Sequence, residues 1–320
     1  MTELERFLNG DLRALAHLVS HVENRRPEFR KLLAELYPRA GRTVRIGITG
    51  PPGAGKSTLV NSFARSLLGE GKSVGVIAVD PTSPFTGGAL LGDRVRMDEF
   101  ESDQKFFFRS MATRGASGGL AQAAGNVALL YDAFGFDFTI IETVGVGQVE
   151  LDIVDACDTV VVMVVPESGD AVQTMKAGLM EIADIFCVNK ADRPGAERIN
   201  SELKQMLKLR KSRNSDWKVP VVSTEATTGK GCDILAQAIA EHLQMARKSS
   251  EFKGRRRRQI RKKLDAIMLS RVSALIEERL PEATDLDDVV TEIYAGKTDP
   301  YTAADKLLNR SISVLENNNP

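Results

Sequence analysis

A glycine-rich segment between a β-branched run and a helical pattern constrains this sequence more than any other feature. In order, its residues are Gly50, Pro51, Pro52, Gly53, Ala54, Gly55, Lys56 and Ser57. The pattern G-x-x-x-x-G-K-S, placed after a strand and at the start of a helix, is typical of a phosphate-binding loop. Its glycines let successive backbone N–H groups point at one phosphate, and the positive end of the helix favours the same anion. A nucleoside triphosphate site is therefore expected here.

Three side chains at the end of this loop extend the prediction. Lys56 is expected to neutralise β- and γ-phosphate oxygens, and Ser57 is expected to offer its hydroxyl to Mg²⁺. Thr58, the next residue, is also expected to bind the nucleotide. The alternative is a glycine-rich turn without function, but the strand before the loop and the helix after it argue against this reading.

A second segment predicts which base is bound. Asn189, Lys190, Ala191 and Asp192 follow a strand that has the composition of a buried one. The Asp192 carboxylate can accept both N1–H and the exocyclic amine of guanine, whereas adenine offers no such pair of donors. After the next strand come Thr224, Glu225 and Ala226, where a backbone N–H can meet the guanine O6. Together with the phosphate loop, these segments predict a site for GTP and GDP.

Several residues between these two segments are candidates for the reacting end of the site. Glu142 closes a predicted strand, at the position where many GTPases carry an aspartate that holds the Mg²⁺ shell. Gly145 can present its N–H to the γ-phosphate. Asp80 and Asp93 are further carboxylates for a cation or an attacking water, although ordinary turn chemistry also explains them. We therefore expect metal contacts from Ser57, Asp80, Asp93 and Glu142. Three arginines (Arg94, Arg109 and Arg114) are expected at the surface or in ion pairs.

The whole chain has an order of elements that favours a parallel sheet covered on both faces. Strands are expected at Val44–Thr49, Ser73–Val79, Phe106–Arg109, Phe138–Glu142, Thr159–Val165, Ile185–Asn189 and Val219–Ser223. Helices are expected at Lys56–Leu68, Gly119–Ala133, Asp170–Met180, Pro194–Lys211 and Cys232–Arg247. The predicted fold class is α/β, with a mostly parallel sheet and helical extensions at both ends.

The expected domains are residues 1–42, an N-terminal helical extension; 43–247, the nucleotide domain; and 248–320, a helical tail. Apolar spacing from Asp11 to Leu36 predicts two short helices interrupted near Pro27. The tail begins with the basic run Arg255–Arg258, which we expect to form a solvated helix face.

Composition limits the possible partners and compartment. Lysine and arginine total 43, and aspartate and glutamate also total 43, which gives no overall charge for binding nucleic acid or an anionic membrane. Three widely spaced cysteines favour a reducing cytoplasm over a disulfide framework. The sequence near its first residues has no apolar signal core, and no apolar run is long enough to span a membrane. We expect a cytoplasmic protein that binds neither membrane nor nucleic acid.

The motifs together resemble one known family, the MeaB/MMAA type of G3E GTPases, also labelled ArgK or LAO/AO transport proteins. The resemblance covers nearly the whole chain. It is carried by the segments 50–57, 79–84, 92–97, 109–115, 142–148 and 189–192, which read GPPGAGKS, VDPTSP, GDRVRM, RSMATRG, ETVGVGQ and NKAD.

This resemblance implies a phosphate-loop NTPase of the SIMIBI or G3E type. It implies a homodimer, made through the helical tail, that hydrolyses GTP with Mg²⁺. It also implies a partner, an adenosylcobalamin-dependent acyl-CoA mutase such as methylmalonyl-CoA mutase, whose cofactor loading the GTPase gates and whose activity it protects. The family places its Mg²⁺ and hydrolysis site at positions matching Asp80, Asp93 and Glu142, and its partner-sensing segment at residues 167–176.

Three alternatives remain open on the sequence. A nickel-delivery GTPase of hydrogenase or urease maturation shares the fold but needs a Cys/His site, which these scattered cysteines and histidines do not supply. A transport-system kinase would use ATP, against which the guanine segment argues. A nucleotide-binding scaffold without turnover would be distinguished by measuring phosphate release.

Overall fold

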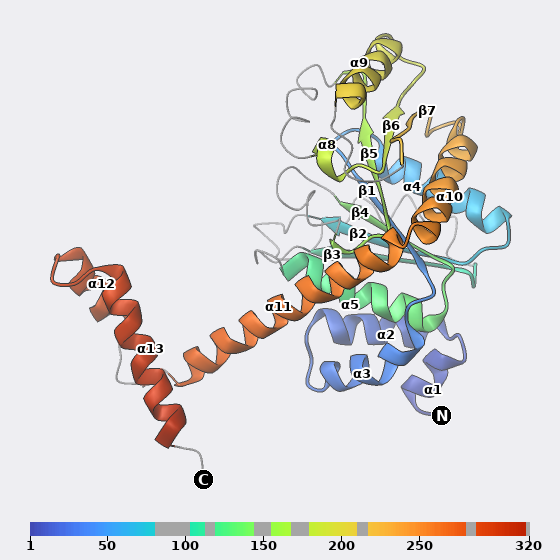
Figure 1. Cartoon of the computed structure of the whole chain (residues 1–320). Coiled ribbons are helices and arrows are strands. Elements are labelled where there is room, and N and C mark those ends of the chain that lie inside the picture. The colour runs from blue at the N-terminus through green and yellow to red at the C-terminus, as the bar shows by residue number, and fades with distance from the viewer. Residues whose placement is uncertain are drawn as a thin grey trace. The chain divides into compact units, whose positions relative to one another are not determined.

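The central element of the molecule is a sheet of parallel strands. The computed structural model describes residues 1–80, 103–112, 119–143, 155–167, 179–209, 217–279 and 286–317. Within these residues, seven strands pair in the order β3-β2-β4-β1-β5-β6-β7, and all neighbouring pairs are parallel. In chain order they are β1 (Val44–Thr49), β2 (Val74–Asp80), β3 (Phe106–Ala112), β4 (Phe138–Thr143), β5 (Thr159–Val164), β6 (Ile185–Asn189) and β7 (Val221–Thr224) (Figure 1). The predicted α/β fold class is confirmed.

The strands lie close to where the β-branched runs predicted them. β1 has the expected bounds, whereas β3 continues past Arg109 to Ala112 and β7 begins at Val221. Every residue of β5 is buried, which explains why this strand reads as a continuous apolar run and not as an alternation. β1 lies between β4 and β5, so the phosphate loop that follows it leaves the middle of the sheet.

Helices cover both faces of the sheet and form two separate apolar cores. On one face, α5 (Gly119–Phe134) and α9 (Ala196–Leu209) contribute to a core that contains Ile77, Tyr131 and Phe186. On the other, α4 (Lys56–Gly69) and α10 (Cys232–Lys248) pack over Ile46 and Ile185. The short helix α8 (Leu179–Ile182) precedes β6. The expected helix Asp170–Met180 lies outside the described residues up to its last two.

The N-terminal extension has one helix more than the sequence predicted. α2 (Leu12–Glu23) and α3 (Phe29–Leu36) were expected; α1 (Glu3–Leu8) was not, and a short turn η1 (Tyr37–Arg39) ends the extension. The signal for α1 was a capping box, because the Thr2 hydroxyl accepts from the Glu5 N–H and the Glu5 carboxylate accepts from the Thr2 N–H. Phe7 of α1 is fully buried, with its ring centroid 5.3 Å from that of Phe134 in α5.

Beyond Ser250, the described residues form three helices, α11 (Glu251–Arg279), α12 (Leu286–Tyr294) and α13 (Pro300–Asn317). The chain divides into a first compact unit, residues 1–259, and a second, residues 260–320. The start of α11 therefore belongs to the unit that contains the sheet. None of the described helices is long and apolar enough to cross a membrane.

The start of α11 corrects one expectation. The basic run Arg255–Arg258 was expected to form a solvated face, but two of its members are held in buried ion pairs. Arg255 donates to both carboxylate oxygens of Asp184 at 2.6 and 2.7 Å, and Arg256 donates to those of Asp158 at 2.9 and 2.8 Å. The expectation was wrong for these two because the carboxylates precede β5 and β6, far from the arginines in sequence. Bidentate pairs of this kind fix the first turns of α11 to the sheet.

A buried carboxylate organises the entry to β1 and gives a test of the fold. The Asp132 side chain of α5 accepts from the backbone N–H groups of Gly41, Arg42 and Thr43 at 2.7, 3.0 and 3.0 Å. Arg45 also pairs with this fully buried carboxylate at 3.3 Å. It therefore ties the N-terminal extension and β1 to α5.

We expect Asp132→Ala to lower the free energy of unfolding by about 2–4 kcal/mol, since it leaves buried donors without an acceptor. Urea denaturation measures this. The control is Asp137→Ala, because exposed Asp137 accepts from the N–H and hydroxyl of Ser73 at the surface. Equal losses in the two variants would contradict the prediction.

Candidate functional site

The phosphate loop passes close to the ends of two neighbouring strands, and glycine is needed where it does. Gly50 has φ +146°, and a Cβ there would lie 2.4 Å from the backbone oxygen of Met163 in β5. Gly55 has φ +84°, and a Cβ there would lie 2.6 Å from the side-chain nitrogen of Asn189. Side chains at these positions would force the loop away from the sheet. The two glycines of the sequence pattern are therefore required by the close packing of the loop against β5 and β6.

Lys56 begins α4 and is folded back over the loop. Its ammonium donates to the backbone oxygens of Gly50 at 2.7 Å and Pro51 at 3.0 Å, and the residue is buried. A buried ammonium held against the loop suits a polyphosphate, because a cation at this place favours an anion bound by the loop.

The side chains of Ser57, at the start of α4, and Glu142, in β4, are in contact. The Ser57 hydroxyl donates to the Glu142 carboxylate at 2.7 Å, and Glu142 is 1% exposed. Glu142 lies in β4 and pairs in register with Ile48 of β1 and Ala78 of β2. A hydroxyl and a buried carboxylate are hard oxygen ligands of the kind that Mg²⁺ prefers. These two residues therefore fit the expected metal.

The other candidates for the reacting end are less fully described. Asp80 is the last residue of β2 and pairs in register with Ala112 of β3. β2 is the neighbour of β4, so the backbone of Asp80 ends at the same edge of the sheet as Glu142. Asp93 and Gly145 lie outside the described residues, as do Arg94 and Arg114.

The segment expected to bind guanine is joined to the phosphate loop through one side chain. The Asn189 amide donates to the backbone oxygen of Ala54 at 2.8 Å. Its oxygen accepts from the Ala226 N–H at 3.1 Å and from the Thr224 hydroxyl at 3.1 Å. Asn189 is 2% exposed, so all these bonds are shielded from water. One residue at the end of β6 therefore connects the phosphate loop with the segment after β7.

The rest of the guanine segment is held by backbone contacts. The Ala191 N–H donates to the Thr224 oxygen at 3.0 Å, and Lys190 has φ +56°, which turns the chain outward after β6. Asp192 follows and is exposed, with its carboxylate free of the packing that holds Asn189. Glu225 lies opposite Lys230, and the pair closes the loop after β7. The hydrogen bond that the Lys230 ammonium donates to the Glu225 carboxylate raises the pKa of Lys230.

Comparison with known proteins decides the family. A family model described as methylmalonyl Co-A mutase-associated GTPase MeaB matches residues 15–280. The chain belongs to the MeaB family. A Pyrococcus abyssi relative is 46% identical over 98% of each chain, and the Escherichia coli GTPase ArgK is 36% identical over 74% of each. The crystal structure of an LAO/AO transport system kinase matches with a TM-score of 0.73 and 27% identity, covering 96% of this chain and 95% of that chain.

This membership confirms two predictions from the sequence. The resemblance to the MeaB, ArgK and LAO/AO proteins is confirmed, and so is the assignment of the chain as a GTPase. The guanine nucleotide is the substrate that this family implies.

Arg109 of β3 is the one of the three arginines considered above that lies within the described residues. Its guanidinium pairs with Glu23 at the end of α2, with Nε at 3.0 Å from the carboxylate. The expectation of an ion-paired arginine is confirmed for this residue.

Ser62 makes a contact that no sequence pattern signals. Its hydroxyl donates to the backbone oxygen of Ala226 at 2.6 Å, which links α4 directly to the guanine segment. α4 contains several small polar residues, and nothing in the sequence distinguishes Ser62 from Ser66 or Asn61. Only the packing of α4 against the segment after β7 reveals this link.

The bridge through Asn189 gives a test of the site. Asn189→Asp keeps the oxygen that accepts from Ala226 and Thr224 but places a carboxylate oxygen against the Ala54 oxygen. We expect the Kd for mant-GDP to rise at least about tenfold, since a buried hydrogen bond becomes a repulsion. Fluorescence titration measures this.

Asn200→Asp is the matched control, because the Asn200 amide donates a hydrogen bond of 3.0 Å to the Ser223 hydroxyl at the surface. It should bind mant-GDP like the unmodified protein. If Asn189→Asp also does so, the side-chain bridge does not hold the nucleotide loops in place.

Proposed function

We propose that this chain hydrolyses Mg·GTP in order to gate the loading of adenosylcobalamin into an acyl-CoA mutase such as methylmalonyl-CoA mutase, and to protect that enzyme. The observation that carries the proposal is the match of residues 15–280 to a family described as methylmalonyl Co-A mutase-associated. The arrangement around Lys56, Ser57 and Glu142 supports the nucleotide half of it. The three buried free cysteines are in keeping with a reducing cytoplasm.

We assign the chain's residues the following roles. The backbone N–H groups of residues 50–58 bind the phosphates, and Lys56 neutralises the β- and γ-oxygens. Ser57 and Glu142 hold Mg²⁺, with Asp80 and Asp93 as further carboxylates for the metal or the attacking water. Bound Mg²⁺ supplies charge neutralisation at the phosphate oxygens.

The remaining roles concern the ends of the nucleotide. The Gly145 N–H binds the γ-phosphate. Asp192 accepts from guanine, the segment Thr224–Ala226 meets its O6, and Asn189 positions that segment. Lys190 completes the guanine motif.

An ion pair supports a link between nucleotide and partner. Glu167 opens the segment 167–176, which the family resemblance assigns to partner sensing, and residues 168–176 lie outside the described part of the chain. Glu167 pairs with Arg193, which directly follows Asp192. The hydrogen bond from Arg193 lowers the pKa of Glu167. The first residue of the segment is thereby joined to the loop that contains the guanine-binding carboxylate.

The test is GTP turnover with and without an adenosylcobalamin-dependent acyl-CoA mutase from the same genome. We expect the mutase to raise turnover at least about tenfold, because switch GTPases accelerate when a partner orders their loops. Phosphate release measures it, and the two proteins should co-purify. Absence of both stimulation and co-purification with every such mutase would refute the proposal.

A matched pair of variants examines the link through Glu167. Arg193→Ala should lower the stimulation while leaving basal turnover unchanged. Arg198→Ala removes a comparably exposed partner of Glu202 on α9 and should lower nothing. Equal stimulation of the two variants by the mutase would show that the ion pair between Glu167 and Arg193 has no role in partner sensing.

We also propose that the chain is a homodimer held by its second unit. Six large apolar side chains of α11 are about half exposed or more: Ile260, Leu264, Met268, Leu269, Val272 and Leu275. Most recur every three or four residues, which forms one stripe on the helix. A contiguous apolar surface of this kind is typical of an interface between subunits.

Truncation after Gln259 should therefore give a monomer that still binds mant-GDP. The cut must leave Arg255, Arg256 and Gln259 in place, because they bond to Asp184, Asp158 and the Cys157 oxygen. Light scattering measures the mass. In the full chain, Leu264→Asp with Met268→Asp should have the same effect, and a dimer that survives both changes would place the interface elsewhere.

A further inference from the structure

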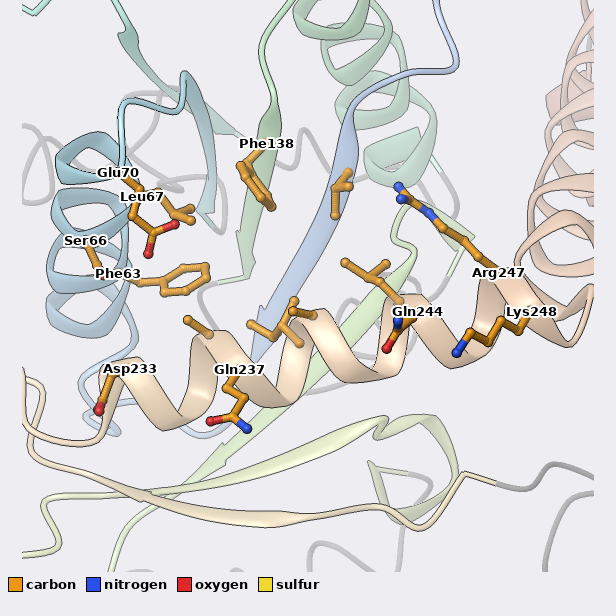
Figure 2. A pocket seen from close by; sticks show the side chains of 15 residues that line it. Phe63, Ser66, Leu67, Glu70, Phe138, Asp233, Gln237, Gln244, Arg247 and Lys248 are labelled. Carbon is orange, nitrogen blue, oxygen red and sulfur yellow. The ribbon is translucent and has the colours of Figure 1, made fainter.

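A groove between α4 and α10 is not used by the proposed nucleotide site. Its volume is about 760 Å³, within the range of pockets that bind small molecules. Figure 2 shows Phe63 and Leu67 of α4 and Phe138 of β4 turned toward the space along α10. Leu243 of α10 completes this apolar floor. The groove therefore offers apolar contact on several sides.

Charge is unevenly distributed along this groove. Arg247 and Lys248 lie in the last turn of α10, and both are exposed. The lining carboxylates are Glu70, which follows α4, and Asp233, in the first turn of α10 at the opposite end of that helix from Lys248 (Figure 2). The end of α10 near Lys248 is therefore cationic.

A second cavity adjoins the first and strengthens this polarity. Its volume is about 600 Å³, and it shares Val44 and Phe138 with the groove. Three cations line it: Arg39, Arg42 and Lys72. Within the described ranges, no carboxylate forms an ion pair with these three side chains.

The two carboxylates of the second cavity already have partners. Asp132 accepts from the backbone at residues 41–43, and Asp137 accepts from Ser73. Arg45 neutralises Asp132 at 3.3 Å, whereas Asp137 keeps its charge, so the three cations outnumber the one carboxylate that has no cationic partner among the described residues. An apolar trough with a surplus of unpaired cations beside it is complementary to a molecule with an apolar body and an anionic head.

We propose that the groove between α4 and α10 binds a small amphiphilic organic anion, with its apolar chain along Phe63, Leu67 and Leu243. Its carboxylate lies toward Arg247, Lys248 and the adjoining basic cavity. Pockets of this type take affinity from apolar burial and orientation from a few charged groups.

Both walls of the groove lead to the nucleotide loops, so the bound anion acts as an effector. α4 begins at Lys56, and α10 follows the guanine segment, whose Ala226 oxygen accepts from Ser62 of α4. A ligand that contacts both helices stabilises their packing and thereby the position of Ala226. By linkage, the bound anion and guanine nucleotide then tighten each other's binding by the same factor. This step rests on the assignment of Thr224–Ala226 to the guanine.

Calorimetry with decanoate on the full chain tests the site. Decanoate should bind the unmodified protein at least about tenfold more tightly than a double variant, Arg247→Glu with Lys248→Glu, because the change places carboxylates beside the anion. The control is Lys204→Glu, an exposed lysine of α9, which contributes to the opposite core. It should bind decanoate like the unmodified protein. Ala236→Trp, which fills the groove, should abolish binding.

Equal decanoate affinity in the double variant and the control would overturn the site, as would equal affinity for decanol, which lacks the charge. The effector role is measured separately, as the Kd of mant-GDP with and without saturating decanoate. We expect this Kd to fall at least about fivefold. An unchanged Kd would overturn the effector role. No mutase is present in these experiments, so their failure is distinguishable from failure of the proposed function.

Discussion

The side-chain amide of Asn189 is the contact on which the proposed nucleotide site depends. It is buried at the end of β6, donates to the phosphate loop at Ala54 and accepts from the guanine segment at Ala226. A planar amide has a donor and an acceptor at a fixed angle, so the two loops take a fixed spacing. The spacing matters because one molecule must reach both the phosphate and the guanine positions. Gly55 is part of the same constraint, since a Cβ there would lie 2.6 Å from this amide.

The parallel sheet explains why such a contact is possible. The carboxyl ends of β1, β4, β6 and β7 end at one edge, so the phosphate loop, Glu142, Asn189 and Thr224 meet there although they are widely separated in sequence. Ligands of open α/β sheets bind at this edge. The amino ends of the strands, at the opposite side of the sheet, hold α11 and not the nucleotide loops. There, Asp158 and Asp184 bind Arg256 and Arg255 and anchor the start of α11.

That anchor is a buried polar network with several members. Asp184 also accepts from the Val160 N–H at 2.8 Å and lies 3.4 Å from His242. Burial lowers the pKa of His242. The Thr159 hydroxyl lies 2.9 Å from the other ring nitrogen of His242. Satisfied networks of this kind favour one arrangement, because a displaced member would leave the others buried without partners. The first turns of α11 are thus held in one position on the first unit.

The sequence by itself determined the elements and their chemistry. The runs 44–49 and 159–165 predicted strands, GPPGAGKS predicted a phosphate loop, and the motifs together indicated the MeaB family, because each of these signals is local or nearly so. The tertiary structure alone decided the pairings. The bond of Ser62 to Ala226, the ion pairs of Arg255 and Arg256, and the groove between α4 and α10 join residues far apart in the chain. Hydrophobic period and residue type report the local conformation and burial of a segment, whereas a particular partner is chosen by the three-dimensional packing of whole helices and strands.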